Sequence, residues 1–374
     1  MAGIYIHVPF CKTRCIYCDF YSNTGLIHKP YLNALYHEID LRRDYLQGEA
    51  IETIYLGGGT PSQLDVASIQ QILEHIFKVF DVRENAEITL EANPDDMTPS
   101  YISHLSALPV NRLSMGVQSF DDQALKFLKR RHSGEQASDV VKRCQDNGFD
   151  NLSIDLMYGL PNQSLHDFEE NIQKAIHLDV QHISAYHLIY EKGTKLFRML
   201  EKEEVRPVDE ELSVDMFRLL INTLTQAGFE HYEISNFARN GKYSKHNTSY
   251  WQGISYLGLG PSAHSYNGKS RQWNIASLNR YVASLKTGVL NAEIEPETPE
   301  IRYNETILTG LRTKWGVNLS RLENEFGKEF LDYCLRNADK YLKNNLLVCD
   351  SNYLKLTLDG IFVSDGVMSD LMWV

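Results

Sequence analysis

The chain has 374 residues, of which 43% are hydrophobic and 23% are charged. This composition is typical of a globular protein, and it excludes a disordered, collagen-like or coiled-coil chain. Acidic residues number 49 and lysines and arginines 37, so the formal net charge is −12. Because neutralising phosphates requires a basic surface, no nucleic-acid partner is expected.

Neither a membrane-spanning segment nor a secretory signal is predicted. No apolar run approaches the roughly 18–20 residues that a spanning helix needs, and the mean hydropathy is −0.34. The opening segment, MAGIYIHVPFCK, lacks the basic stretch before an apolar one that a secretory signal has. We therefore predict a cytoplasmic protein.

The first half of the chain alternates short apolar segments with amphipathic ones. Several of the apolar segments are almost continuously hydrophobic, as buried parallel strands are. They predict strands at Ile4–Val8, Thr53–Leu56, Glu87–Glu91, Arg112–Val117, Leu152–Met157 and His182–Leu188. Apolar residues on one helical face predict a helix from Ile69 to Phe80 and another from Glu211 to Ala227. Strand followed by helix, six times over, predicts right-handed crossovers and a parallel sheet, and a closed barrel would need eight such units.

The C-terminal part has a different pattern. A further strand is predicted at Phe229–Ser235, and the acidic, proline-containing stretch Glu293–Glu300 is predicted to be a linker. After it come helices at Ile301–Arg312, Leu319–Phe326 and Glu329–Asn344 and strands at Leu346–Cys349 and Tyr353–Leu358. Helices followed by a small hairpin predict a winged-helix-like domain, and the lack of a basic stripe argues against DNA binding.

The predicted architecture is therefore an α/β fold with three parts. Residues 1–235 form an open, partial (βα)6 barrel, residues 236–292 extend it, and residues 293–374 form a C-terminal helical, winged-helix-like domain.

Three of the six cysteines, Cys11, Cys15 and Cys18, lie within eight residues directly after the first predicted strand. In a reducing cytosol such a cluster favours metal or redox chemistry over disulfides. A structural zinc site has four ligands, so zinc would need His7 or His28 as well. A 4Fe–4S cluster held by three cysteines would keep one iron open for a ligand. The other cysteines are expected to be buried apolar side chains: Cys144, Cys334 and Cys349.

Cys-x3-Cys-x2-Cys at the end of the first strand of a partial βα barrel resembles the motif of the radical S-adenosylmethionine (SAM) superfamily. The resemblance implies that the open iron binds the amino and carboxylate groups of SAM. It also implies that an electron from the reduced cluster cleaves the sulfonium to give a 5′-deoxyadenosyl radical.

Several residues at the predicted strand ends fit a SAM site. The loop Gly57-Gly-Gly-Thr-Pro61 follows the second strand, and its glycines would let a ligand approach the backbone closely. A charge that points inward from an apolar strand, as expected of Glu91 and Asp155, is costly unless it is paired or liganded. The resemblance implies SAM contacts from Tyr5, Tyr17, Gly58, Gly59, Thr60, Glu91, Gln118, Arg130 and Asp155. By itself, Arg130 could equally be a charge on a helix surface.

The strings HVPFC, CDF, GGGTPS, RLSMGVQSF, DLMYGLP and GPSAHS resemble the coproporphyrinogen dehydrogenase branch over nearly the whole chain. That branch contains two groups, the oxygen-independent coproporphyrinogen III dehydrogenases and the HemW group of haem chaperones. The dehydrogenases have a fourth cysteine where this chain has Phe20. They also carry an N-terminal extension, for which the early first strand leaves no room.

Residues 246–251, HNTSYW, match the HNxxYW signature of the haem chaperone group. The resemblance implies that haem is bound, with His246 as a candidate axial ligand and Tyr250 and Trp251 against the macrocycle. From chemistry alone, a loop histidine beside an aromatic pair anchored in the core is the more common arrangement. His264, in GPSAHS, would line the substrate cavity or be a satisfied, partly buried histidine.

The expected function is thus haem binding and delivery to haem-requiring proteins, such as respiratory enzymes at the membrane, rather than porphyrin-forming catalysis. The expected cofactors are a 4Fe–4S cluster, SAM and haem. The rival function is oxidative decarboxylation of two coproporphyrinogen III propionates to vinyl groups. The sequence leaves open whether the protein forms a homodimer.

Overall fold

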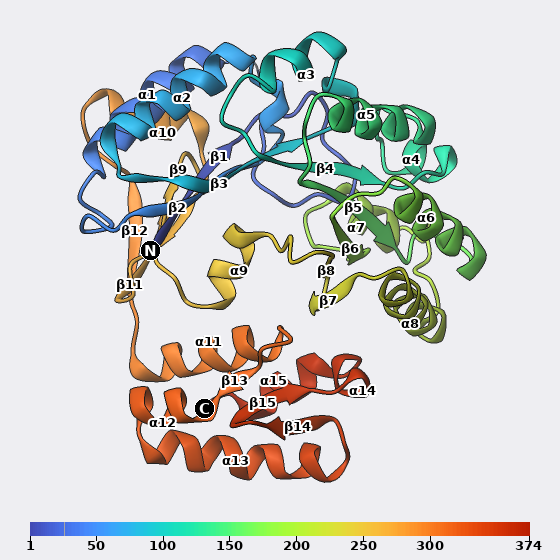
Figure 1. Ribbon diagram of the computed structural model, residues 1–374. Coiled ribbons are helices and arrows are strands. Elements are labelled where there is room, and N and C mark those ends of the chain that lie inside the picture. The colour runs from blue at the N-terminus through green and yellow to red at the C-terminus, as the bar shows by residue number, and fades with distance from the viewer. Residues whose placement is uncertain (26) are drawn as a thin grey trace.

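Six parallel strands form the centre of a curved sheet in the computed structural model, which describes residues 1–25 and 27–374 (Figure 1). They are β1 (Ala2–Val8), β2 (Ile51–Gly58), β3 (Val82–Ala92), β4 (Arg112–Gln118), β5 (Leu152–Tyr158) and β6 (His182–His187). All six predicted strands are confirmed, and β3 begins earlier than predicted. The inner residues of these strands are almost all buried. Helices cover one face of the sheet, and other parts of the chain cover the opposite face.

Most of the helices that follow these strands lie on the outer face of the sheet (Figure 1). The helices are α1 (His28–Leu41), α2 (Val66–Val79), α3 (Pro99–Leu105), α4 (Asp122–Phe127), α5 (Gly134–Asp146), α6 (Leu165–His177), α7 (Lys195–Glu201) and α8 (Glu210–Gln226), with short 3-10 turns η1 (Pro61–Gln63) and η2 (Pro94–Asp96). Helix α7 instead packs against the cysteine loop after β1, where the Leu196 N–H donates to the Ile16 carbonyl at 2.8 Å. Asp65 caps α2 by accepting a hydrogen bond from the Ser68 N–H at 2.7 Å. The apolar stripe of α2 is buried as predicted.

One edge of the sheet differs from the prediction. Instead of one strand at Phe229–Ser235, the chain forms a hairpin of β7 (Glu230–Glu233) and β8 (Asn236–Ala238), and β8 pairs antiparallel with β6. The turn is stabilised by the Glu233 carboxylate, which accepts hydrogen bonds from the Ser235 N–H and the Asn236 side chain. This side-chain turn reverses the chain before a longer strand can form.

At the other edge, β9 (Tyr256–Leu259) adds parallel to β1, followed by antiparallel β10 (His264–Tyr266), β11 (Ser270–Asn274) and β12 (Ala292–Pro296). Helices α9 (Lys245–Trp251) and α10 (Leu278–Lys286) belong to the same region. The predicted linker at Glu293–Glu300 is therefore partly wrong, because its first residues pair with β11. An acidic, proline-containing segment can serve as an exposed edge strand, which needs only one partner.

The C-terminal residues form a smaller unit below the sheet in Figure 1, with its own hydrophobic core. It contains α11 (Pro299–Leu311), β13 (Val317–Asn318), α12 (Leu319–Phe326), α13 (Lys328–Lys343), β14 (Leu347–Asp350), β15 (Tyr353–Leu356), α14 (Leu358–Ile361) and α15 (Ser364–Leu371). The predicted helices and strands are confirmed, whereas β13 and the last two helices were not predicted. The domain limits 235/236 and 292/293 stay predictions; the first falls inside the β7–β8 hairpin.

Of the three cysteines outside the loop, two are buried and one is exposed. Cys144 in α5 and Cys334 in α13 are buried, as predicted. Cys349 is exposed on β14, so its predicted burial is wrong: only the first residue of this edge strand, Leu347, faces the core. Of the helices described in residues 1–25 and 27–374, none is long and apolar enough to span a membrane.

Candidate functional site

The cysteine loop that follows β1 is closed by hydrogen bonds between its two ends and is tied to the barrel by an ion pair. The Cys11 N–H donates to the Asn23 carbonyl at 3.0 Å, and Lys12 pairs with the buried Asp96 carboxylate at 2.8 Å. Cys11, Cys15 and Cys18 are all half-buried. Burial, with a smaller contribution from the other two thiols, raises the pKa of Cys18 to about 11. The free Cys18 thiol therefore remains protonated unless a bound cation stabilises its thiolate.

The donor set of this loop fits an iron–sulfur cluster. In the described part of the chain, no three His, Cys, Asp or Glu side chains converge on a point where one metal ion would be enclosed. A 4Fe–4S cluster does not require such convergence, because each cysteine binds a different iron. His7, one of the two candidates for a fourth zinc ligand, has both ring nitrogens in hydrogen bonds, to the Tyr5 hydroxyl and the Tyr21 carbonyl.

The glycine loop after β2 packs directly against the cysteine loop. Gly58 has φ +104°, and a Cβ atom there would lie 2.6 Å from the His7 ring. A Cβ atom on Gly59 would lie 2.8 Å from the carbonyl oxygens of Val8 and Phe10, so glycine is needed at both positions. Thr60 Oγ1 lies 3.4 Å from Cys11 Sγ. The three residues predicted in this loop are thus adjacent to the first cysteine.

Two partly buried carboxyl groups face the interior of the barrel. Glu91, near the end of β3, accepts hydrogen bonds from the Tyr55 hydroxyl at 2.8 Å and from the Gly58 N–H at 3.2 Å. Burial raises the pKa of Glu91 to about 7 and, on β5, the pKa of Asp155 to about 6. The negative charge of Asp155 adds to the shift at Glu91. A cationic ligand group between these carboxyls would lower both pKa values and bind tightly.

These carboxyls give the ligand-free protein a specific pH dependence. Native Glu91 holds its proton up to about pH 7 against an ordinary value of 4.5, so the free energy of unfolding should fall as pH rises from about 4.5 to 7. Glu91→Gln should flatten this decrease, leaving the smaller contribution of Asp155. Urea unfolding at a series of pH values measures this dependence of the unfolding free energy on pH. Asp139→Asn, at an exposed position, is the control. Equal slopes in wild type and Glu91→Gln would contradict the assignment.

Arg130 and Tyr17 lie near Cys15. Arg130 is nearly buried, and its guanidinium donates to the Gly116 carbonyl, to the Asn93 side chain and to Cys15 Sγ, the last at 3.6 Å. It is therefore not a charge on the surface of a helix. Burial raises the pKa of the Tyr17 phenol, and the positive charge of Arg130 acts in the opposite direction.

Gly116 and Asn93 were not predicted as site residues. Gln118 ends β4 with φ +68°, after an irregularity in the pairing with β5. A Cβ atom on Gly116 would lie 3.0 Å from Gln118 Nε2 and 3.1 Å from Arg130 Nη2, so a larger residue would crowd both side chains. Asn93 could have been found from its position just after Glu91, where β3 ends.

His246 lies away from this group, in the barrel interior. It is fully buried on α9, with Nδ1 2.8 Å from Thr53 Oγ1 and Nε2 2.7 Å from the Tyr250 hydroxyl. Its ring stacks on Tyr55 with centroids 5.1 Å apart, and burial lowers its pKa to about 3. Both ring nitrogens of His246 are engaged in hydrogen bonds. This arrangement corresponds to the alternative interpretation of the sequence, in which the histidine is anchored in the core. Tyr5 connects the two regions, since its ring lies 6.3 Å from that of His246.

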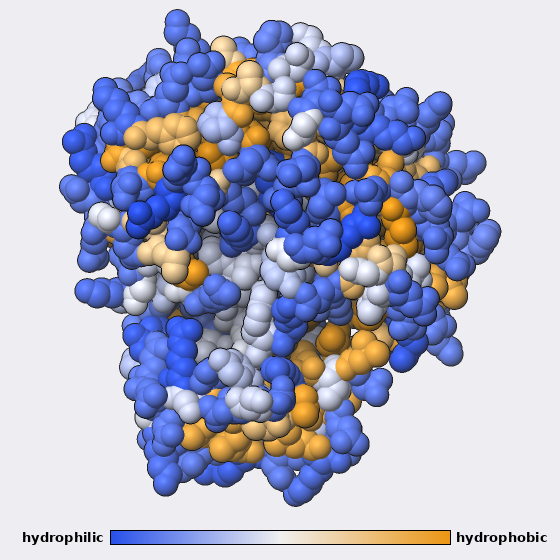
Figure 2. Space-filling model, in the orientation of Figure 1, coloured by the Kyte–Doolittle hydropathy of each residue, from blue (hydrophilic) through white to orange (hydrophobic). Residues whose placement is uncertain are grey.

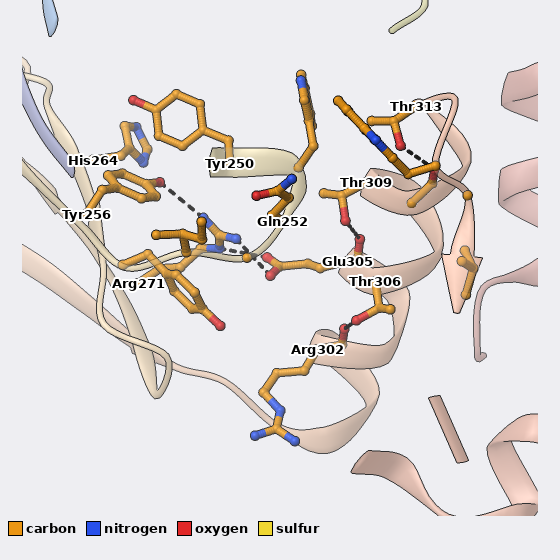
Figure 3. A pocket seen from close by; sticks show the side chains of 18 of the residues that line it. Tyr250, Gln252, Tyr256, His264, Arg271, Arg302, Glu305, Thr306, Thr309 and Thr313 are labelled. Carbon is orange, nitrogen blue, oxygen red and sulfur yellow. Dashed lines mark hydrogen bonds and ion pairs between the residues drawn. The ribbon is translucent and has the colours of Figure 1, made fainter. Parts of the chain in front are cut away.

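A cavity of about 1090 Å³ separates the barrel from the C-terminal unit. Ligand pockets usually have about 300–1,000 Å³, so this one has room for a large ligand. The aromatic residues that line it are Tyr5, Phe20, Tyr21, Tyr250, Trp251, Tyr256, Tyr266, Trp315 and Tyr353. In Figure 3, Tyr250, Tyr256 and His264 lie opposite the α11 side chains. Figure 2 shows white to pale-blue residues of intermediate hydropathy between the two parts of the molecule.

The cavity adjoins the cysteine loop. Phe20, two residues after Cys18, is 66% exposed and lines the cavity together with Tyr21. His264, in the GPSAHS string, is exposed on the cavity wall, where its ring stacks with that of Trp273 at 6.0 Å. His246 is absent from the cavity lining formed by residues 1–25 and 27–374, and Tyr250 stands between the two. Residues between 302 and 355 form the opposite wall of the cavity. None of them was predicted as a site residue.

Comparison with known proteins agrees with this arrangement. The chain matches the radical SAM superfamily over residues 5–175 and the HemN C-terminal domain over residues 298–363. It is 34% identical to haem chaperone HemW of Mycobacterium tuberculosis, over 99% of this chain and 94% of that one, and 34% identical to that of Bacillus subtilis, over 98% of each. Coproporphyrinogen III oxidase (HemN) from Escherichia coli has the same fold, with a TM-score of 0.85 over 99% of this chain and 90% of that one at 23% identity. The chain therefore belongs to the HemW family of the radical SAM superfamily.

Proposed function

We propose that this protein is a haem chaperone, which binds haem in the large cavity and delivers it to haem-requiring proteins. The observation that carries the proposal is the aromatic cavity of about 1090 Å³ beside the cysteine loop. Tyrosine and tryptophan rings offer flat apolar surfaces on which a macrocycle can stack. The HemW relatives are named haem chaperones and align over the whole chain, which supports the same function.

The cysteine loop would hold a 4Fe–4S cluster, with SAM beside it. Cys11, Cys15 and Cys18 would each bind one iron, and when bound the two cofactors supply one-electron chemistry at the sulfonium. Arg130 would stabilise the Cys15 thiolate. Glu91 would receive the SAM ammonium group, and the open backbone of the glycine loop leaves space for that ligand.

Two histidines are candidates for the axial ligand. His246, the residue of the HNTSYW string, would need to release Tyr250 and turn toward the cavity before it could bind iron. His264 already lies on the wall and is exposed. The acceptors we propose are respiratory enzymes at the membrane, reached from the cytoplasm. Location and acceptors rest on the sequence prediction.

A haem titration tests this function and chooses between the ligands. The wild type should develop a Soret band and saturate near one haem per chain, and the variant of the true ligand should bind at least about tenfold more weakly with a shifted band. The variants are His264→Ala and His246→Gln; glutamine can keep hydrogen bonds to Thr53 and Tyr250. The exposed His166→Ala is the matched control. A folded wild type without saturable binding would contradict the proposal.

The rival enzymatic function is excluded or established by one incubation. Cluster-reconstituted protein is incubated anaerobically with SAM, a reductant and coproporphyrinogen III, and protoporphyrinogen IX and 5′-deoxyadenosine are quantified. We expect no protoporphyrinogen, because Phe20 occupies the position of the fourth cysteine and lies in the cavity wall. Stoichiometric formation of both products would make the protein a dehydrogenase.

A further inference from the structure

The cavity is positively charged although the protein is acidic. Five basic and two acidic side chains line it, a formal excess of three positive charges in a chain of net charge −12. The basic residues are Arg271, Arg302, Lys314, Arg321 and Lys355, and the acidic ones are Glu305 and Glu325. All except Arg271 belong to the C-terminal unit. A concentration of positive charge in a cavity attracts an anionic ligand.

Most of these cations are already neutralised. Arg271 donates to both oxygens of Glu305, at 2.6 and 2.7 Å, and also lies 3.2 Å from the Glu297 carboxylate. Two acids on one guanidinium make this group a structural clamp between β11 and α11. Lys314 pairs with Glu230 outside the cavity, and Lys355 pairs with Asp350 at 3.0 Å.

Arg302 and Arg321 are different because they share one acid. Arg302 Nη2 lies 3.4 Å from one oxygen of Glu325, and Arg321 Nε lies 3.4 Å from the other. Charge-assisted hydrogen bonds are about 2.7–2.9 Å long, so both pairs are loose. Within the described residues, Arg302 Nε has no hydrogen-bond partner. Within this trio the two cations exceed the acid by one charge, and several of their N–H donors have no close acceptor; Glu297, the second acid on Arg271, also acts on Arg302 electrostatically. In Figure 3 the Arg302 guanidinium extends away from the Arg271–Glu305 pair.

We propose that Arg302 and Arg321 form a carboxylate-binding site that receives the propionate groups of a tetrapyrrole, while its macrocycle lies against the aromatic wall. The planar guanidinium fork matches a carboxylate in two parallel hydrogen bonds, which a single lysine cannot provide. The opposite wall, with Tyr250, Tyr256 and His264, suits the apolar ring and its iron. This inference rests on the proposed haem binding and assigns the orientation of the ligand in the cavity.

The test removes the charge from the ligand and from the protein separately. Haem and its dimethyl ester are titrated in the same cosolvent against wild type, Arg302→Gln, Arg321→Gln and the double variant. We expect wild type to prefer haem over the ester by about tenfold or more, since two propionates gain charge-assisted hydrogen bonds. The double variant should bind haem as weakly as the ester, with ester affinity unchanged. Arg336→Gln, exposed on α13 outside the cavity, changes net charge equally and should keep the preference.

Each outcome separates this inference from the proposed function. If wild type binds haem and ester equally, the carboxylate site is wrong while haem binding stands. If the variants lose affinity for both ligands to the same extent, the arginines act on the structure of the cavity and the site is again wrong. If wild type binds neither, both proposals fall. Because the Arg321 side chain is largely exposed, Arg321→Gln should fold. Its affinity for haem and for the ester therefore tests the carboxylate site independently of the other variants.

Discussion

Replacing Cys15 with serine is expected to eliminate the iron–sulfur cluster. After anaerobic reconstitution the wild type should contain about four irons with matching sulfide and absorb near 400 nm, and the variant should contain less than about one. Only three thiols lie in the loop, and none of the other three cysteines can substitute. Two of those are buried in α5 and α13, and Cys349 is on β14 in the C-terminal unit. SAM binding should be lost as well, since the open iron disappears with the cluster.

Cys349→Ser is the matched control because it removes one thiol from an exposed position. It should retain the full iron and sulfide content. Full cluster occupancy in Cys15→Ser would mean that the three-thiol assignment is wrong. One zinc and no sulfide in anaerobically purified wild type would instead support the mononuclear alternative.

Replacing Glu38 with alanine is expected to lower the free energy of unfolding by about 3–5 kcal/mol. The Glu38 carboxylate is fully buried and accepts hydrogen bonds from the Tyr281 hydroxyl at 2.6 Å, the Asn274 side chain at 2.7 Å and the Gly260 N–H at 2.8 Å. It also lies 3.6 Å from the guanidinium of Arg42, which is itself buried. Truncation leaves this cation without its counter-charge and three donors without an acceptor.

The same substitution should weaken haem binding, because Gly260 begins the loop that carries His264 to the cavity wall. Urea unfolding followed by circular dichroism measures the stability. Glu49→Gln removes only an exposed ion pair with the N-terminus, so it should change the unfolding free energy by less than about 1 kcal/mol. A similarly small change for Glu38→Ala would show that the network does not stabilise the fold.

The sequence by itself determined the parallel core, and it placed the three cysteines and the residues proposed for SAM at one edge of the sheet. Strand positions follow from runs of apolar residues, and the carboxyl ends of parallel strands meet at one edge of the sheet. Residues as distant as Thr60, Glu91 and Asp155 were therefore predicted at the same edge. The dense cysteine spacing made the cluster loop recognisable without any knowledge of packing. These features depend on local pattern and on one general rule of sheet topology.

Only the tertiary structure decided what surrounds that site. Whether His246 or His264 reaches the cavity depends on Tyr250, Thr53 and the loop held by Glu38, which come from distant parts of the chain. The pairing of β9 with β1 and the edge strand β12 likewise join segments with no local signal of partnership. The cavity and its positive wall exist because the C-terminal unit lies across the barrel. A cavity is a property of the surfaces that enclose it, and contacts between distant segments cannot be derived from local periodicity.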